Sequence, residues 1–382
     1  MRILIAHSFY RVPGGEDRYV AQQVELLGDR HEVHLAQRRN EDLGKAAAIK
    51  VMLGSRSVRL SLEDEIRAFG PDVIHLHNAY PSFGPSVQNA ARSTDTPLVM
   101  TVHNYRLRCP NGLTFTHDGN CVRCVGGAYY NAVIHRCFPT RDQSLAYASA
   151  LWLHRFIFKV ERSVNVFVCP SEFIQTRLIG WGIDPDRTAL VRNFTSSPGS
   201  PNGSAGTYGA YVGRLSSEKG LDILLRALKI AGDPPFQIVG GGPTEDELKR
   251  LGEELGLENT HFVGFVDPTA VRKLVAEARY IAFPSVWNEN APLAALEAMT
   301  AARPLLVTRV GGLPELVQTG GGLACAPGDV EELAAGIRRL MDDQRLCETA
   351  GAQAAMMARS EFHPAVHLQR LEDVYERVRK PR

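Results

Sequence analysis

The chain has 382 residues, of which 44% are apolar and 22% are charged, and its formal net charge is +1. This composition fits a globular protein of roughly two to three domains and excludes a disordered or collagen-like chain. The near-zero net charge does not indicate a nucleic-acid-binding protein. Seven cysteines, an odd number in a long chain, argue against a secreted disulfide scaffold.

No apolar run reaches the length of a transmembrane segment, and the run 3–6 after Arg2 is too short for a signal peptide. We therefore expect a soluble cytoplasmic protein.

Short apolar strands alternate with helical patterns through the first half of the chain. The expected strands are 3–6, 32–35, 72–77, 97–103 and 164–169, and the expected helices include 18–27 and 61–69. Strands buried on both faces and separated by helices predict a doubly wound α/β domain with a parallel sheet.

A linker separates this series from a second one. Residues 195–207 read TSSPGSPNGSAGT, in which nine of thirteen residues are Gly, Pro or Ser. The expected strands beyond it are 208–212, 236–239, 261–263, 281–283 and 305–308, and the expected helices are 221–230, 245–255 and 271–278. We predict domains at 1–194 and 208–362, followed by a C-terminal segment, 363–382, that carries an amphipathic helix over 365–378.

Two glutamates eight residues apart follow the strand that ends at Phe283. Glu289 precedes a helix that we expect to begin near Pro292, and Glu297 lies inside that helix. Open α/β sheets bind ligands at this edge, so the two carboxylates could hold different hydroxyls of one elongated ligand. The alternative is a capping acid followed by a solvated helix glutamate.

A basic pair occupies another strand-to-helix loop, GRLSSEKG. Arg214 and Lys219 lie between two glycines there and suit a diphosphate, although a surface Arg and Lys are the simpler interpretation. The sequences VGGGP at 239–243 and GGLPE at 311–315 form further turns of this type. None of these turns is G-x-G-x-x-G, which disfavours a dinucleotide oxidoreductase.

Taken together, these motifs resemble those of the family-4 retaining glycosyltransferases, also called glycosyltransferase group 1. The second half matches through GRLSSEKG, VGGGP, FVGFV, the PSVW stretch with its two glutamates, and GGLPELV. The first half matches through Gly14-Gly15, Thr101-Val-His103-Asn104 and Pro170-Ser171. The resemblance covers nearly the whole chain and implies a GT-B fold, with two Rossmann-like domains facing a cleft and a last helix that crosses back to the first domain.

The resemblance also implies roles for individual residues. Arg214 and Lys219 would bind the donor diphosphate, Glu289 would contact donor-sugar hydroxyls, and Glu297 would hold the ribose. Further donor contacts would come from Gly14, Gly15, His103, Gly264, Phe265, Asn290, Ala291, Pro292 and Leu293. Of the two neighbouring histidines, we expect His75 to be structural and His77 to face the cleft.

The implied reaction is transfer of a hexosyl group, with retention, from a nucleotide diphosphate sugar. UDP-sugars are favoured and GDP-sugars come next; the acceptor would be a glycan, lipid-linked or small-molecule hydroxyl in polysaccharide, glycolipid or glycoside biosynthesis. No catalytic cofactor is expected, because Arg214 and Lys219 replace a metal. The alternatives are a nucleotide-sugar epimerase and a non-catalytic nucleotide-sugar or glycan-binding protein.

An insertion near 105–140 departs from the family pattern. It contains four of the seven cysteines, at Cys109, Cys121, Cys124 and Cys137. Such a cluster can bind structural zinc, with His117 and His135 as substitute ligands. A disulfide or redox pair and free buried thiols remain open.

The region around this insertion is basic. Residues 101–177 contain nine Lys or Arg and four Asp or Glu, a local balance of +5, and residues 145–160 are aromatic and basic. This stretch could lie on an anionic membrane surface and meet an anionic or lipid-linked acceptor, at the inner face of the cell membrane. The alternative is a helix whose aromatic side chains fill the domain core.

Overall fold

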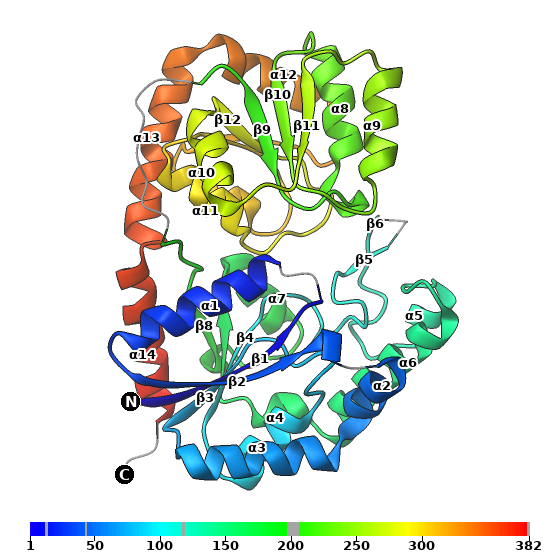
Figure 1. The fold of residues 1–382 in the computed structure, drawn as a ribbon, viewed down its shortest axis with the longest axis vertical. Coiled ribbons are helices and arrows are strands. Elements are labelled where there is room, and N and C mark those ends of the chain that lie inside the picture. The colour runs from blue at the N-terminus through cyan, green and yellow to red at the C-terminus, as the bar shows by residue number, and fades with distance from the viewer. Residues whose placement is uncertain (12–13, 43, 117–118, 197–205, 380–382) are drawn as a thin grey trace. The chain divides into compact units, whose positions relative to one another are not determined.

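The structure is a computed structural model that describes residues 1–11, 14–42, 44–116, 119–196 and 206–379. The chain divides into two compact units, one formed by Met1–Arg192 with His367–Arg382 and the other by Asn193–Val366. Each unit contains a six-stranded sheet (Figure 1), which confirms the predicted α/β class. Most of the predicted linker, residues 197–205, lies outside the described residues.

The sheet of unit 1 has the strand order β2-β1-β3-β4-β7-β8, and every neighbouring pair is parallel. Its strands are β1 (Arg2–Phe9), β2 (Glu32–Arg39), β3 (Val73–Leu76), β4 (Leu98–Thr101), β7 (Val166–Cys169) and β8 (Thr188–Leu190). The helices around it include α1 (Gly15–Gly28), α2 (Lys45–Gly54), α3 (Arg56–Phe69), α4 (Ser86–Ser93), α7 (Glu172–Gly180) and α14 (Pro364–Val378).

Successive side chains of a strand point to opposite faces of the sheet, so β1 and β3 contribute to two layers. Leu4 and Ile74 belong to the core that includes Leu62 and Ile66 of α3. On β3, His75 instead contacts α14, where its Nδ1 lies 2.6 Å from the hydroxyl of Tyr375.

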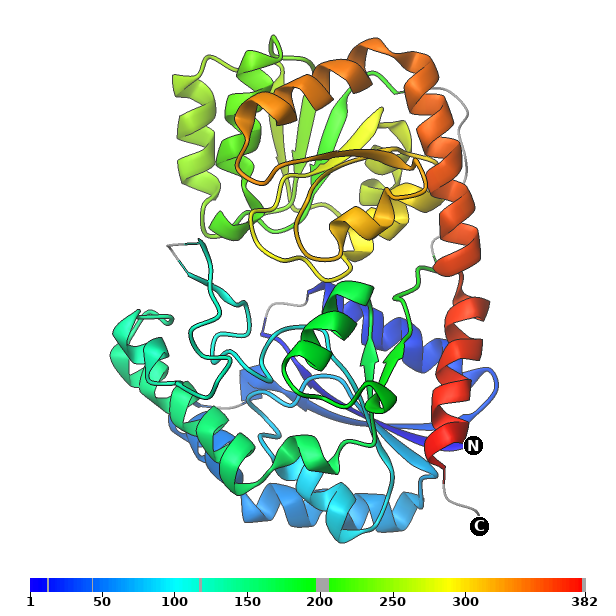
Figure 2. The same ribbon diagram turned by 180° about the vertical axis from the view of Figure 1, so that it is seen from behind.

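From His367 onward, the C-terminal helix α14 belongs to unit 1; it is the red helix at the end of the chain in Figure 2. Nε2 of the buried His367 lies 3.1 Å from the side-chain nitrogen of Gln23 and 3.3 Å from the Tyr19 hydroxyl. The carboxylate of Glu372 lies 2.7 Å from Nε2 of His31. These polar contacts accompany an apolar face of α14, so the helix is held by both packing and hydrogen bonds.

The sheet of unit 2 has the order β11-β10-β9-β12-β13-β14 and is also parallel throughout. Its strands are β9 (Gly209–Val212), β10 (Phe236–Val239), β11 (Thr260–Gly264), β12 (Tyr280–Phe283), β13 (Leu305–Thr308) and β14 (Gly322–Cys325). Its helices are α8 (Leu221–Ile230), α9 (Glu245–Glu254), α10 (Pro268–Glu277), α11 (Leu293–Thr300), α12 (Val330–Asp342) and α13 (Gln344–Glu361).

A separate apolar core covers each face of this sheet. Ile281 of β12 packs in the core that includes residues of α10, α11 and α13. The next residue, Ala282, packs in the core that includes residues of α8, α9 and α12. This alternation explains why the strands are continuous apolar runs, because both of their faces are buried.

The insertion between β4 and β7 forms a small subdomain of unit 1. It begins with a hairpin of two short strands, β5 (Phe115–Thr116) and β6 (Gly119–Asn120), each of two residues. The helices α5 (Asn131–Ile134) and α6 (Arg141–Trp152) follow, and a π-helical turn over Leu153–Ile157 comes last. Its own apolar cluster is small and consists of Cys124, Tyr129, Ala132, Ala148 and Leu151. Among the described helices of the chain, none is long and apolar enough to cross a membrane.

The contact between His75 and Tyr375 generates a stability prediction. Tyr375→Phe removes the hydroxyl and leaves the buried Nδ1 of His75 without this partner. We expect the free energy of unfolding to fall by about 1–3 kcal/mol, measured by urea denaturation. The same substitution at the exposed Tyr130 should change it by less than about 0.5 kcal/mol. Equal effects of the two substitutions would contradict a stabilising role for this hydrogen bond.

The buried histidines of unit 1 generate a pH prediction. Burial lowers the pKa of His75 from 6.5 to about 3 and that of His367 to about 4. Because these folded-state values lie below the unfolded value, the unfolded chain takes up protons first as the pH falls. Above about pH 6.5 these histidines do not lower the free energy of unfolding. Below that pH the free energy of unfolding falls by up to about 1.4 kcal/mol per pH unit for each histidine.

We therefore expect the urea midpoint to fall between pH 7 and pH 5. His75→Gln should reduce this dependence, whereas the same substitution at the exposed His261 should leave it unchanged. A midpoint that does not move over this range would show that the buried histidines do not control the acid sensitivity.

Candidate functional site

The strand order of unit 2 changes direction beside β9. The chain runs from β9 outward to β10 and β11, and then returns to place β12 on the other side of β9. The loops that leave β9 and β12 therefore diverge at the carboxyl edge of the sheet, where open α/β sheets bind ligands. Lys219 lies on the first of these loops and Glu289 on the second.

The structure brings these two predicted residues together. Nζ of Lys219 lies 2.5 Å from Oε1 of Glu289, and the Ser285 hydroxyl donates to the same oxygen at 2.7 Å. The Lys219 ammonium also lies 5.2 Å from the ring centroid of Trp287. Glu289 is buried, at 5% exposure, so its charge depends on these partners rather than on bulk water.

Two glycines allow the loops to approach each other this closely. Gly220 has φ +67°, and a Cβ there would lie 2.3 Å from the carbonyl oxygen of Pro284. Gly311 has φ +58°, and a Cβ there would lie 2.0 Å from the carbonyl oxygen of Glu289. A side chain at either position would push apart the segments that hold the ion pair.

Glu297 and Arg214 have different surroundings. Glu297 lies about one turn into α11 and is 6% exposed; Pro292 is the N-cap residue and not the first helical residue. Arg214 is exposed and forms no ion pair with the described residues, although its carbonyl accepts from the Tyr211 hydroxyl at 2.7 Å. The structure thus joins Lys219 and Glu289 but leaves the Arg214 guanidinium open to solvent.

The remaining predicted donor contacts of unit 2 lie on loops at the same edge of the sheet. Gly264 ends β11, and the ring of Phe265 after it is 80% exposed. Asn290 is buried, and the carbonyl of Ala291 accepts from the Asn193 side chain at 3.1 Å. Pro292 and Leu293 form the junction with α11.

In unit 1 the strand order changes direction between β1 and β3. Gly14 is the N-cap of α1, and both Gly14 and Gly15 are exposed. The N–H of Gly14 donates to Asp17 at 3.1 Å, and the other carboxylate oxygen of Asp17 lies 2.8 Å from Nε2 of the buried His7. Sequence reasoning missed Asp17; its only local signal is an acidic residue three positions after a glycine N-cap.

The predicted histidines belong to the segments around β3 and β4. His75 lies within β3, His77 directly follows β3, and His103 lies two residues after β4. His75 bridges Tyr375 and the Thr101 hydroxyl, which lies 2.7 Å from its Nε2, so it has structural contacts. Nδ1 of His77 lies 2.9 Å from Nε2 of His103, and the two rings stack. Burial lowers the pKa of His103 to about 3 and holds that of His77 well below its usual value. Both rings are therefore neutral at pH 7.

These two histidines line a pocket of unit 1 with about 560 Å³ of empty volume, part of it open to solvent. The guanidinium of Arg106 lies in this pocket, 5.1 Å from the ring centroid of Tyr80 and 5.5 Å from that of Tyr147. Neither Arg106 nor Arg155, which also lines the pocket, forms an ion pair with the described residues. Sequence reasoning predicted a basic region here but not this arrangement of aromatic rings around a cation.

The four cysteines of the insertion line one pocket of their own, together with His135. All four are free thiols. Within the described residues, no group of three or more His, Cys, Asp or Glu side chains is already arranged so that it could hold a metal ion. His117, the other predicted substitute ligand, lies outside the described residues.

Two known families match the chain, one for each half. The family described as Glycosyltransferase Family 4 matches residues 13–196, and that described as Glycosyl transferases group 1 matches residues 203–357. A glycogen synthase from Mycobacterium tuberculosis (strain CDC 1551 / Oshkosh) is 27% identical over 361 residues, which cover 90% of this chain and 78% of that protein.

Solved structures share the fold over the full length. The sucrose-phosphate synthase of Thermosynechococcus elongatus matches with a TM-score of 0.73 at 18% identity and covers 98% of both chains. HepE from Anabaena, in complex with UDP, matches with a TM-score of 0.69 at 20% identity and covers 99% of this chain and 100% of that one. HepE has also been solved with UDP-glucose. The two parallel-sheet domains are thus those of the GT-B fold, and the chain belongs to the group 1 glycosyltransferases of family 4.

Proposed function

We propose that this glycosyltransferase moves a hexosyl group, with retention of configuration, from a nucleoside diphosphate sugar to a hydroxyl acceptor. The observation that carries the proposal is the Lys219–Glu289 pair at the point where the unit 2 strand order changes direction. A cation and a carboxylate at this edge match the two parts of such a donor, an anionic diphosphate and a sugar rich in hydroxyls.

The similarity to HepE supports a nucleotide donor, because that protein binds UDP and UDP-glucose. We therefore favour a UDP-sugar, with a GDP-sugar as the next candidate. The exposed ring of Phe265 offers a flat apolar surface near which a base could lie, and the buried Glu297 offers a carboxylate for ribose hydroxyls.

Breaking the sugar–phosphate bond places negative charge on the departing diphosphate and positive charge on the sugar ring. Fixed cations that face the phosphate stabilise this separation more than they stabilise the ground state. Lys219 is already held by Glu289 and lies near the Trp287 ring, which restricts the positions of its ammonium. The exposed Arg214 supplies a second, planar cation that can bind two phosphate oxygens at once.

The same ion pair gives Glu289 a second role. A diphosphate competes for the Lys219 ammonium, so donor binding frees an oxygen of Glu289 to accept hydrogen bonds from sugar hydroxyls. We propose a front-face reaction in which the departing phosphate helps to deprotonate the acceptor. We also propose that His103, which is neutral, contacts the donor sugar through a hydrogen bond rather than through a charge.

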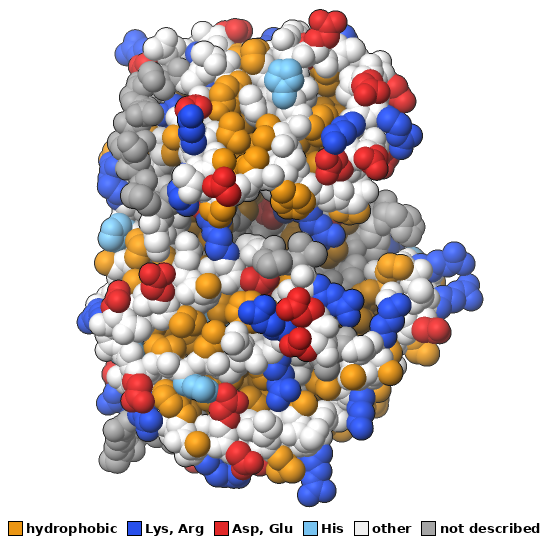
Figure 3. Space-filling model, viewed as in Figure 1, with side chains coloured by type: hydrophobic (Ala, Val, Ile, Leu, Met, Phe, Trp, Pro, Cys, Tyr) orange, Lys and Arg blue, Asp and Glu red, His pale blue; other side chains and the backbone are white. Residues whose placement is uncertain are grey.

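For the acceptor we propose an anionic or lipid-linked molecule. The pocket beside His77 and His103 contains the guanidinium groups of Arg106 and Arg155, neither of which forms an ion pair with the described residues. Glu161, which also lines the pocket, is paired with Arg108, and Glu16 interacts with Arg106 only through a longer-range electrostatic contact. Basic side chains gather over the insertion, with apolar ones between them (Figure 3). Exposed aromatic and aliphatic side chains there include Tyr130, Ile134, Leu145, Trp152, Phe156 and Ile157, which supports a peripheral contact with an anionic membrane.

The proposal predicts which substitutions stop turnover. Glu289→Gln and Lys219→Ala should each lower the rate of donor cleavage by about 10²–10³-fold, by analogy with the loss of one oxyanion-stabilising group. The measurement is release of UDP from UDP-sugars, with water as acceptor when no other hydroxyl is supplied. The matched controls are Glu277→Gln and Lys273→Ala, a largely exposed pair on α10 that should keep the wild-type rate.

Proton NMR of the released sugar tests retention. The first product should have the same anomeric configuration as the donor sugar, before it mutarotates. An inverted first product would contradict the mechanism, and a Glu289→Gln enzyme that works at the wild-type rate would contradict the site.

A further inference from the structure

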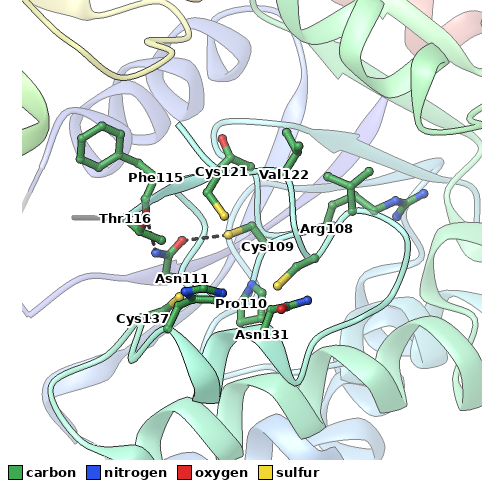
Figure 4. A pocket seen from close by; sticks show the side chains of 14 residues that line it. Arg108, Cys109, Pro110, Asn111, Phe115, Thr116, Cys121, Val122, Asn131 and Cys137 are labelled. Atoms are coloured by element: carbon green, nitrogen blue, oxygen red, sulfur yellow. Dashed lines mark hydrogen bonds between the residues drawn. The ribbon is translucent and has the colours of Figure 1, made fainter. Parts of the chain in front are cut away.

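Four thiols from three separate segments meet in the insertion of unit 1. Cys109 follows β4, Cys121 and Cys124 follow the β5–β6 hairpin, and Cys137 follows α5. All four line the same pocket. Figure 4 shows the side chains of Cys109, Cys121 and Cys137 around one space, and the Cys109 sulfur donates to Oδ1 of Asn111 at 2.9 Å.

The turn after Cys109 is closed by Gly112, which has φ +76° and donates its N–H to the Cys109 carbonyl at 2.9 Å. A polar N–H group is already directed at one of the other sulfurs. The Arg123 guanidinium donates to the sulfur of Cys121 at 3.7 Å. Metal-bound ligands are oriented by such outer hydrogen bonds, and N–H donors offset the negative charge of thiolates.

Beyond Cys109, which packs in the core of unit 1, the insertion has little apolar core of its own. Its hairpin has two residues in each strand, and its apolar cluster has five buried members, one of which is Cys124 itself. Small units with so little apolar burial are commonly stabilised by disulfides or a metal, and these thiols are free. The other three cysteines, Cys169, Cys325 and Cys347, pack inside the large cores and do not line this pocket. Cys109 belongs to the same core as Cys169, but it also lines the pocket of the four thiols.

We propose that the insertion binds one Zn²⁺ ion through Cys109, Cys121, Cys124 and Cys137. The four thiols release their protons to solvent, and their sulfurs draw together to about 2.3 Å from the ion in a closed tetrahedral site. The Cys109 sulfur gives up its hydrogen bond to Asn111 in this step. Soft thiolate ligands favour zinc over the hard cations magnesium and calcium.

This zinc site would also position the two arginines of the neighbouring pocket. Arg106 donates to the carbonyl of Pro110 at 3.4 Å, and Pro110 directly follows Cys109. Arg155 donates to the carbonyl of Val125 at 2.9 Å, and Val125 directly follows Cys124. The proposed site does not depend on the identity of the sugar donor or of the acceptor.

The test is elemental analysis of the full chain, purified without a metal-binding tag or chelator. We expect about one zinc ion per chain. A Cys121→Ala/Cys124→Ala variant should lose the zinc ion. The matched Cys169→Ala/Cys347→Ala variant, which removes two buried thiols elsewhere in the chain, should keep it. Protein without metal would overturn the proposal, as would iron in place of zinc or a double cluster variant that retains the ion.

Two measurements on the wild-type chain avoid dependence on a variant that does not fold. Stepwise addition of a mercurial thiol reagent should release zinc in proportion to the cluster thiols that react. Replacement of zinc by Co²⁺ should give the strong visible bands of tetrahedral cobalt with sulfur-to-metal charge transfer. Peptide mapping without reduction that finds disulfides among the four cysteines would overturn the proposal instead.

Discussion

The ion pair between Lys219 and Glu289 is the contact on which the proposed donor site of this glycosyltransferase depends. It joins the loops that leave β9 and β12 at the point where the strand order of unit 2 changes direction. The close approach of these loops requires glycine at positions 220 and 311. The Ser285 hydroxyl also donates to the Glu289 carboxylate and so stabilises its negative charge. Because a buried carboxylate is costly without its partners, the pair orients both groups before any donor arrives.

Much of this fold could be predicted from short apolar runs, and what was missed depends on pairing across the sheet. The predicted bounds of α8, β10 and β13 agree with the structure, because the apolar pattern of each segment is sufficient to predict it. The edge strands β8 and β14 have only three and four residues and few β-branched side chains, so they depend on β7 and β13 for their formation.

For the site, the sequence indicated the loops that carry Lys219 and Glu289. It did not indicate the distance between the two side chains, because that distance depends on β9 and β12 being neighbours in the sheet. Arg106 between two tyrosines and the His77–His103 pair join segments far apart in the sequence, and no local pattern reports such contacts.

The two units contribute different chemistry. Unit 2 presents charged groups at a sheet edge, whereas unit 1 presents buried histidines that are neutral at pH 7 and a pocket with two arginines. The insertion next to this pocket has little apolar core of its own, and the zinc ion that we propose for its four thiols would cross-link it. This division agrees with the proposal that unit 2 binds the donor and that unit 1 binds the acceptor.

The most direct test of the central claim is the melting temperature of the chain with UDP, GDP, ADP or dTDP, without added metal. A nucleotide at about 100 times its dissociation constant should add roughly 2.7 kcal/mol and raise the midpoint by several degrees. We expect such a rise with one nucleotide, UDP first, for the wild type and little or none for Lys219→Ala. No rise with any nucleotide, or an equal rise in Lys219→Ala, would contradict a donor site built on the Lys219–Glu289 pair.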